Sequence, residues 1–270
     1  MELMDNVEKL SNIEYWDSVL KNAKLPLLVK TKHYSTWLLN NFFAKSIEAG
    51  NYKTLMEVGA GSSAWLPFLA KEYNLVVSCL DYSEVGCRLC EENLNIQKIE
   101  FQDILNKDLL DWNDHRKYDV LVSFGVIEHF DNPEVVVNIC TQHINQRGLI
   151  ITVIPNLSGF PGWIAKKFVT DVFNMHKNIS LNELIAYHEK NGFQTLKADY
   201  TGFFYPMLIP WASKKNGLLG IKFFRAPILK LMEVLNLIVS RLWIFFRISG
   251  SFRHFSPFLI YVGKVPSSNG

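Results

Sequence analysis

The stretch that decides the fold is Leu55-Met-Glu-Val-Gly-Ala-Gly-Ser-Ser-Ala64, an apolar run that leads into a glycine-rich turn. Gly59 and Gly61 permit a tight turn and let the backbone approach a ligand closely. The helical pattern that follows would present unpaired backbone N–H groups at the same point. The sequence therefore predicts a strand, a ligand-binding turn that includes Ser62, and a helix.

Outward from this turn, short apolar runs alternate with amphipathic segments. The apolar runs are Thr54–Val58, Leu75–Leu80, Ile99–Phe101, Val120–Phe124, Leu149–Ile154 and Phe193–Lys197. Helical patterns lie between them at 63–73, 84–94, 133–144 and 180–191. Continuous apolar strands that alternate with helices indicate a parallel sheet covered on both faces. We expect an α/β fold of the doubly wound, Rossmann-like type, with a mostly parallel seven-stranded sheet and its ligand at the carboxyl ends of the strands.

The remaining segments indicate how the chain is organised around this sheet. Residues 1–50 carry helical periodicity ahead of the first strand, and we expect an N-terminal helical lid there. Residues 51–200 would form the ligand-binding core. Residues 201–254 are rich in aromatic and apolar residues, and Phe258–Val262 reads as a strand that follows them. We therefore expect a helical insertion over 201–254 and the final strand of the core sheet within 255–265.

The lid prediction depends on an amphipathic segment that has no sheet partner of its own. Tyr15 and Trp16 should face inward from it, and its closure would exclude water from the reacting groups. The alternative is a helix that stays packed on the sheet permanently.

Composition excludes several classes of protein. The chain has 270 residues, with 28 Lys and Arg against 26 Asp and Glu, and 49% of its residues are hydrophobic. A disordered chain is excluded, and the near-neutral balance offers no basic stripe for a nucleic-acid partner. Four cysteines make no disulfide framework, and the first residues show no basic or apolar signal segment. We expect a cytoplasmic protein that acts as a monomer or homodimer.

Acidic residues follow two of the predicted strands. Asp81 ends the second apolar run, twenty residues beyond Gly61, where a carboxylate can accept hydrogen bonds from both hydroxyls of a ribose. Tyr82 comes directly after it. Asp103 and Ile104 follow the third run and would lie at the same edge of the sheet. A helix N-cap is the alternative role for Asp103.

Glu57 separates the two cofactor classes that share this layout. A dinucleotide places its pyrophosphate at the glycine turn, and a carboxylate two residues before Gly59 would repel it. A ligand that carries an amino group and a sulfonium would instead accept that charge. S-adenosylmethionine has both groups and no phosphate, so the sequence favours it over NAD.

These features together resemble the class I S-adenosylmethionine-dependent methyltransferases that act on small molecules. Glu57–Ser63 is similar to their first motif, Tyr118–Pro133 to their fourth, and Gly148–Asn156 to their fifth strand and its exit. The cofactor-binding residues that the resemblance implies are Glu57, Gly59, Gly61, Ser62, Asp81, Tyr82, Asp103, Ile104, Phe124, Gly125 and Glu128. The resemblance covers about residues 10–200. Ser63 departs from it, because many members have a third glycine at that position.

Two histidines are candidates for catalysis. His129 follows the strand Val120–Phe124, and its imidazole titrates near neutrality, as a base for a hydroxyl acceptor would. His176 precedes Ser180 and Glu183, whose spacing predicts a helix-capping box, so we expect it in a loop over the acceptor site. The alternative roles are to order the loop, for His129, and to lie on the surface, for His176.

The spacing of the other potential ligands is not typical of a metal site. Cys87 and Cys90 form an isolated pair, with no second pair and no neighbouring histidine. We expect no metal, and two ordinary half-buried cysteines.

The pattern over Ala226–Ile248 predicts an amphipathic helix. Its polar positions fall, at about 100° per residue, within an arc of roughly 140°, and the rest of the surface is almost wholly apolar. Four charges across this segment argue against a membrane-spanning helix, whereas its basic flanks suit a helix on a membrane surface. Burial against its own domain or a second subunit is the alternative. With the aromatic run at 203–211, we expect membrane-surface contact through residues 203–248.

The expected activity is therefore transfer of a methyl group from S-adenosylmethionine to an oxygen or nitrogen of a small molecule or glycan, lipid-linked acceptors included. One alternative is a non-catalytic regulatory subunit that binds S-adenosylmethionine, and a weaker one is an NAD-dependent oxidoreductase. The set Glu57, Gly59, Gly61 and Asp81 argues for cofactor binding and leaves turnover open.

Overall fold

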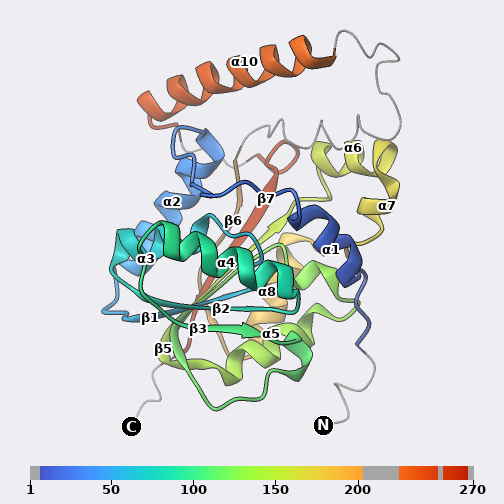
Figure 1. Ribbon diagram of the computed structural model, residues 1–270. Helices are drawn as coiled ribbons and strands as arrows, with labels where there is room; N and C mark the ends of the chain where they lie inside the picture. Colours follow the sequence, from blue (N-terminus) through green and yellow to red (C-terminus); the bar gives the residue numbers. More distant parts are fainter. Residues whose placement is uncertain (1–6, 203–224, 249–251, 267–270) are drawn as a thin grey trace.

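A seven-stranded sheet lies at the centre of the molecule, with helices on both faces (Figure 1). The computed structural model describes residues 7–202, 225–248 and 252–266. The strands are β1 (Thr54–Val58), β2 (Val76–Asp81), β3 (Phe101–Asn106), β4 (Tyr118–Phe124), β5 (Ile144–Pro155), β6 (Gln194–Thr201) and β7 (Phe258–Lys264). Their order across the sheet is β3-β2-β1-β4-β5-β7-β6.

The direction of the strands confirms the doubly wound, mostly parallel sheet. Strands β1 to β5 run parallel, and β7 inserts antiparallel between β5 and β6. The winding reverses between β1 and β4, which are neighbours in the sheet. A crevice forms at such a reversal because the connections leave the two strands in opposite directions. The glycine turn after β1 therefore lies at the natural ligand-binding position of the fold.

The helices divide between the two faces of the sheet. They are α1 (Ile13–Leu20), α2 (Tyr34–Ile47), α3 (Trp65–Tyr73), α4 (Glu84–Ile96), α5 (Pro133–Gln142), α6 (Phe160–Phe168), α7 (Thr170–Phe173), α8 (Leu181–Lys190) and α10 (Arg225–Phe245), with short 3-10 helices η1 (Leu109–Asp111) and η2 (Ile127–His129). Buried side chains of α2, α3 and α4 form one hydrophobic core with the sheet, and those of α5 and α8 form the other. Both faces of β1 and β4 are thus covered, which explains their continuous apolar sequences.

Local signals position several helix starts. Ser83 caps α4, because its hydroxyl accepts the backbone N–H of Gly86 at 3.0 Å. The predicted capping box is confirmed at α8, where Ser180 and Glu183 bond reciprocally. Helices α6 and α7 have no counterpart in the sequence prediction.

Helix α10 lies apart from the sheet and contacts α2 (Figure 1). The ring of Trp243 meets Tyr34 edge-on at 5.0 Å, and the Tyr34 hydroxyl donates to the carbonyl of Ile248 at 2.7 Å. The aromatic run at 203–211 lies outside the described residues. Among the helices that the structure describes, none combines the length and apolar character that a bilayer crossing requires.

Candidate active site

A cavity of about 360 Å³ opens at the carboxyl ends of β1, β2 and β4. Its walls come from the glycine turn after β1, the end of β2, the loop after β4 and the N-terminal segment. The predicted cofactor residues that line it are Glu57, Gly59, Gly61, Ser62, Asp81, Tyr82, Phe124 and Gly125. The fold thus brings together residues from three separate parts of the sequence.

The two glycines of the turn have backbone conformations that suit glycine. Gly59 has φ 71° and Gly61 has φ 39°, both in the left-handed region. A Cβ on Gly59 would lie 2.5 Å from Cγ2 of Val126, so a side chain there would clash with the loop after β4. Because these two residues have no side chain, the backbone of the turn is open to the cavity.

Asp81 connects the turn to the second strand. Its Oδ2 accepts the backbone N–H of Gly61 at 2.7 Å, and its Oδ1 accepts that of Ser83 at 2.8 Å. Burial raises the pKa of this carboxyl, and the two N–H donors partly offset that effect. Each carboxylate oxygen keeps a further lone pair for a hydroxyl donor in the cavity.

Glu57 lies at the floor of the cavity with 2% of its surface exposed. The Ser63 hydroxyl donates to its Oε2 at 2.8 Å. Burial raises the pKa of this carboxyl to about 8, so its ionised form needs a cationic partner. The amino group of an amino acid moiety meets that need, whereas a pyrophosphate would be repelled.

Ser63, the departure from the expected third glycine, has a local role. Its hydroxyl accepts the backbone N–H groups of Trp65 and Leu66, at 3.0 and 3.1 Å, while it donates to Glu57. One side chain therefore accepts two backbone N–H groups at the start of α3 and orients the buried Glu57 carboxylate.

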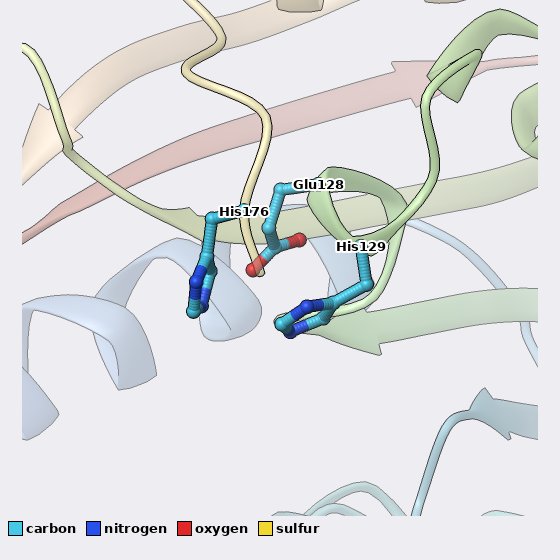
Figure 2. Close-up of side chains that lie close together, drawn as sticks. All are labelled: Glu128, His129 and His176. Atoms are coloured by element: carbon cyan, nitrogen blue, oxygen red, sulfur yellow. The ribbon is translucent and has the colours of Figure 1, made fainter. Parts of the chain in front are cut away.

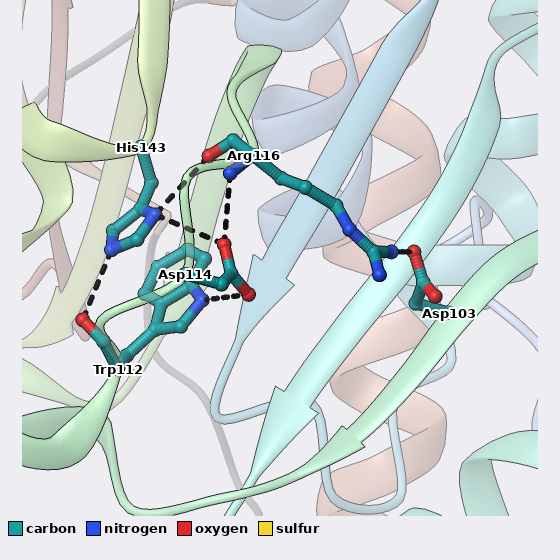
Figure 3. Close-up of polar contacts among 5 residues, drawn as sticks. All are labelled: Asp103, Trp112, Asp114, Arg116 and His143. Atoms are coloured by element: carbon teal, nitrogen blue, oxygen red, sulfur yellow. Dashed lines mark hydrogen bonds and ion pairs between the residues drawn. The ribbon is translucent and has the colours of Figure 1, made fainter.

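Asp103 and Ile104 do not line the cavity, and their predicted placement at the strand end is wrong. Strand β3 continues to Asn106, which pairs with Asp81, while Asp103 pairs with Ser78 further back. The Asp103 carboxylate forms an ion pair with Arg116, beside the contacts of Asp114 and His143 (Figure 3). The apolar run at Ile99–Phe101 marks the start of the strand, so the prediction placed its end too early.

The residues that do occupy this position follow the true end of β3. Asp108 and Leu109 line the cavity, and Asp108 forms an ion pair with Lys9 of the N-terminal segment. Trp65, Val126 and Phe130 also line it and were not predicted. The signal available in the sequence was the polar Asn106-Lys-Asp108 stretch, which ends the β3 pattern.

The N-terminal segment forms one wall of the cavity. Trp16 and Leu20 of α1 line it, and the Trp16 ring meets His129 edge-on at 5.1 Å. Asp17 accepts the Ser83 hydroxyl at 2.5 Å, which attaches α1 to the start of α4. Tyr15 does not line the cavity, so Trp16 alone of the predicted pair faces inward.

The two candidate catalytic histidines lie together with Glu128 (Figure 2). The rings of His129 and His176 have centroids 4.4 Å apart, and His129 also lines the cavity. Glu128 and His176 do not line it, although their potential ligand atoms lie within 4.8 Å of that of His129. The fold brings η2, which follows β4, next to the loop before α8.

The protonation states of this cluster depend on burial. Burial, followed by the neighbouring His176, lowers the pKa of His129 to about 4, and burial also lowers that of His176. Burial raises the pKa of the Glu128 carboxyl to about 8. His129 is therefore neutral at neutral pH, and a group with so low a pKa is a weak general base.

Cys87 and Cys90 lie buried in α4 as free thiols, more buried than expected. They do not line the cavity.

Part of the chain matches a known family of domains. A model of the methyltransferase domain matches residues 56–150, which span β1 to β5. No curated protein sequence matches the chain significantly.

Solved structures share the fold at low identity. Coclaurine N-methyltransferase, bound to N-methylheliamine and S-adenosylhomocysteine, has a TM-score of 0.60 and 13% identity over 98% of this chain and 85% of its own. The cyclopropane synthase MmaA2 from Mycobacterium tuberculosis has a TM-score of 0.59 and 13% identity, over 94% of this chain and 98% of its own. The N-methyltransferase NodS from Bradyrhizobium japonicum has a TM-score of 0.56 and 11% identity, over 96% of this chain and all of its own. The chain therefore contains a stretch, residues 56–150, that matches a methyltransferase domain, and it shares its fold with these methyltransferases and the cyclopropane synthase.

Proposed function

We propose that this enzyme methylates an oxygen or nitrogen atom of an amphiphilic small molecule or glycan, such as a lipid-linked sugar. The observation that carries the proposal is the cavity that joins the glycine turn, Asp81 and His129 within one space. The cofactor would lie against the glycine turn and Asp81, and the acceptor toward His129. That two of the similar structures are named N-methyltransferases supports a nitrogen acceptor alongside an oxygen acceptor.

The residues present fit S-adenosylmethionine. Glu57 would pair with its amino group, Asp81 would accept from its ribose hydroxyls, and the turn at Gly59 and Gly61 would contact it through the backbone. When bound, the cofactor supplies a methyl group on a positively charged sulfur. The aromatic rings of Trp65 and Phe124, stacked with centroids 5.6 Å apart on the cavity wall, would attract that charge.

The chemistry then requires alignment and exclusion of water. Helix α1 supplies Trp16 and Leu20 as one wall, which would keep solvent away from the acceptor. An acceptor with a hydroxyl or amine would lie beside His129. Its heteroatom takes the methyl group and releases a proton to solvent as the bond to sulfur breaks.

An exposed apolar face on α10 supports an amphiphilic acceptor. Leu231, Leu235 and Phe245 are 58%, 51% and 79% exposed, and Val234, Ile238 and Leu242 lie on the same face. Exposed Lys230, Arg241 and Arg247 accompany it. Apolar side chains with basic neighbours suit the surface of an anionic membrane. We propose that the enzyme works at the cytoplasmic face of such a membrane.

Aromatic contacts also lie between the packed side of α10 and α6. Trp243 meets Phe252 at 5.7 Å, and Phe255 meets Phe160 of α6 at 6.2 Å. Trp163 on α6 is 54% exposed. We propose that Trp163 adds a second apolar contact with the same membrane.

Two experiments test the activity. Equilibrium titration with S-adenosylmethionine should show one site per chain, and transfer of a radiolabelled methyl group should label an acceptor in a lipid extract of cells. Binding without any transfer, across lipid and aqueous extracts, would instead support a regulatory subunit. Binding of a nicotinamide cofactor and none of S-adenosylmethionine would contradict the proposal outright.

Flotation with liposomes tests the membrane contact. The intact protein should float with anionic vesicles, and a variant with Leu231, Leu235 and Phe245 changed to Ser should not. Trp243 is unsuitable as a target because it packs on Tyr34. Serine at the exposed Ile96 and Leu196, far along the chain from α10, provides the matched control. An intact protein that stays unbound and elutes as a dimer would point to a second copy on this face.

A further inference from the structure

Glu128, His129 and His176 form a cluster that the reaction described above does not require. Each offers one potential ligand atom, and these atoms all lie within 4.8 Å of one another. Glu128 and His129 come from η2, and His176 comes from the loop before α8 (Figure 2). The expectation of no metal rested on the isolated pair Cys87 and Cys90 and on the lack of ligand spacing among the other histidines, so it did not consider this cluster.

In both imidazoles, Nδ1 contacts a backbone carbonyl oxygen. Nδ1 of His129 lies 2.7 Å from the carbonyl oxygen of Met175, and Nδ1 of His176 lies 2.6 Å from that of Val172. A carbonyl can only accept, so each Nδ1 carries the proton and each Nε2 keeps its lone pair. A histidine whose second nitrogen donates to a backbone carbonyl is oriented and polarised as metal ligands usually are.

The Glu128 carboxylate lacks a partner of its own. Its side chain is 1% exposed, and neither Oε1 nor Oε2 has a hydrogen-bond partner among the described residues. The nearby Lys177 ammonium donates to the carbonyl oxygen of Asp131, at 2.5 Å. A buried carboxylate without a partner is costly, and a bound cation would supply the missing charge.

We propose that Glu128, His129 and His176 bind a divalent transition-metal ion of the Zn²⁺ class, which holds the acceptor heteroatom at the edge of the cofactor cavity. Two imidazoles and one carboxylate are a ligand set of catalytic zinc sites, which keep a further position open. They are unsuited to Mg²⁺, which prefers oxygen ligands. Zinc ligands at about 2.0–2.2 Å lie roughly 3.3 Å from one another, so the three side chains would move inward on binding.

The role of the ion rests on the proposed function. His129 lines the cavity, so the open coordination position would face the acceptor. A hydroxyl bound there loses its proton to water more readily, because the cation stabilises the oxyanion. Its oxygen then forms the bond to the methyl carbon as the carbon–sulfur bond breaks. His129 would serve as a ligand in place of the general base that the sequence suggested.

Metal binding by the full chain tests the proposal independently of turnover. Protein treated with chelator and dialysed would be titrated with Zn²⁺ by calorimetry, and with Co²⁺ by absorption. We expect one equivalent to bind. His176→Ala and Glu128→Gln should each weaken Zn²⁺ binding by more than about 100-fold. Loss of a residue that only hydrogen-bonds to a metal ligand costs roughly 10- to 100-fold, and loss of a ligand itself should cost more. His115→Ala, at an exposed histidine outside the cluster, should bind as the unmodified protein does.

The outcomes separate this inference from the proposed function. No stoichiometric Zn²⁺ binding, or equal affinity in a correctly folded His176→Ala or Glu128→Gln variant, would overturn the metal site. A strong sulfur-to-cobalt charge-transfer band would assign the metal to cysteines and overturn it too. S-adenosylhomocysteine, titrated into the same samples, reports the cofactor site separately. If the unmodified protein binds Zn²⁺ and not S-adenosylhomocysteine, the proposed function fails and the metal site stands.

Discussion

Asp81→Ala is the substitution that most directly tests the cofactor site. The carboxylate accepts two buried backbone N–H groups and retains lone pairs toward the cavity, where a ribose would donate. Loss of hydrogen bonds to a charged group costs about 1.5–3 kcal/mol. The affinity for S-adenosylhomocysteine should therefore fall about 10- to 150-fold, as calorimetry would measure it. The free protein should also lose roughly 2–6 kcal/mol of unfolding free energy, because the N–H groups of Gly61 and Ser83 become unsatisfied.

Two further variants separate these effects. Asp81→Asn retains one acceptor oxygen and should lie between the unmodified protein and Asp81→Ala in both affinity and stability. Asn106→Ala removes bonds to the carbonyls of Asp81 and Tyr82 but no group that lines the cavity. Its affinity should stay within about threefold of the unmodified protein. A folded Asp81→Ala protein with unchanged affinity would refute the ribose assignment.

Three other substitutions follow from the same contacts. Gly59→Ala should weaken binding of S-adenosylhomocysteine about tenfold or more. The left-handed backbone costs an alanine about 1–2 kcal/mol, and the new Cβ meets Val126. Unchanged binding in calorimetry would contradict this. Deletion of residues 1–20 should abolish methyl transfer and leave urea unfolding cooperative, since it removes Trp16 and Leu20 from the cavity wall; full turnover would defeat the lid. His188, buried between Thr152 and the Leu184 carbonyl, has its pKa lowered by burial from 6.5 to about 4. Its folded-state pKa lies below the unfolded value, so the contribution of neutral His188 to stability is fully present above about pH 6.5. That contribution is lost as the pH falls toward 4, and the loss reaches about 2–3 kcal/mol at pH 4.5. Urea unfolding across this range should show a smaller pH dependence in His188→Gln.

The elements of the core were predictable because their signals are local. Strand β1 was predicted with its observed bounds, and β7 was expected after the long helix, since buried strands and amphipathic helices each impose a short period on the sequence. The end of β3 was not predictable in this way, because this edge strand has only half-buried and exposed residues and so carries no continuous apolar pattern. Asp103 was therefore assigned to a position that Asp108 occupies.

The sequence by itself determined the sheet, the glycine turn and the two carboxylates Glu57 and Asp81, because these depend on residues that are close along the chain. Only the tertiary structure decided which distant residues share the cavity. Trp16 and Leu20 reach it because α1 packs on α4, and His176 reaches His129 because the loop before α8 returns to the end of β4. Such contacts arise from the packing of whole elements against the sheet, and packing couples residues that no periodicity or spacing along the chain relates.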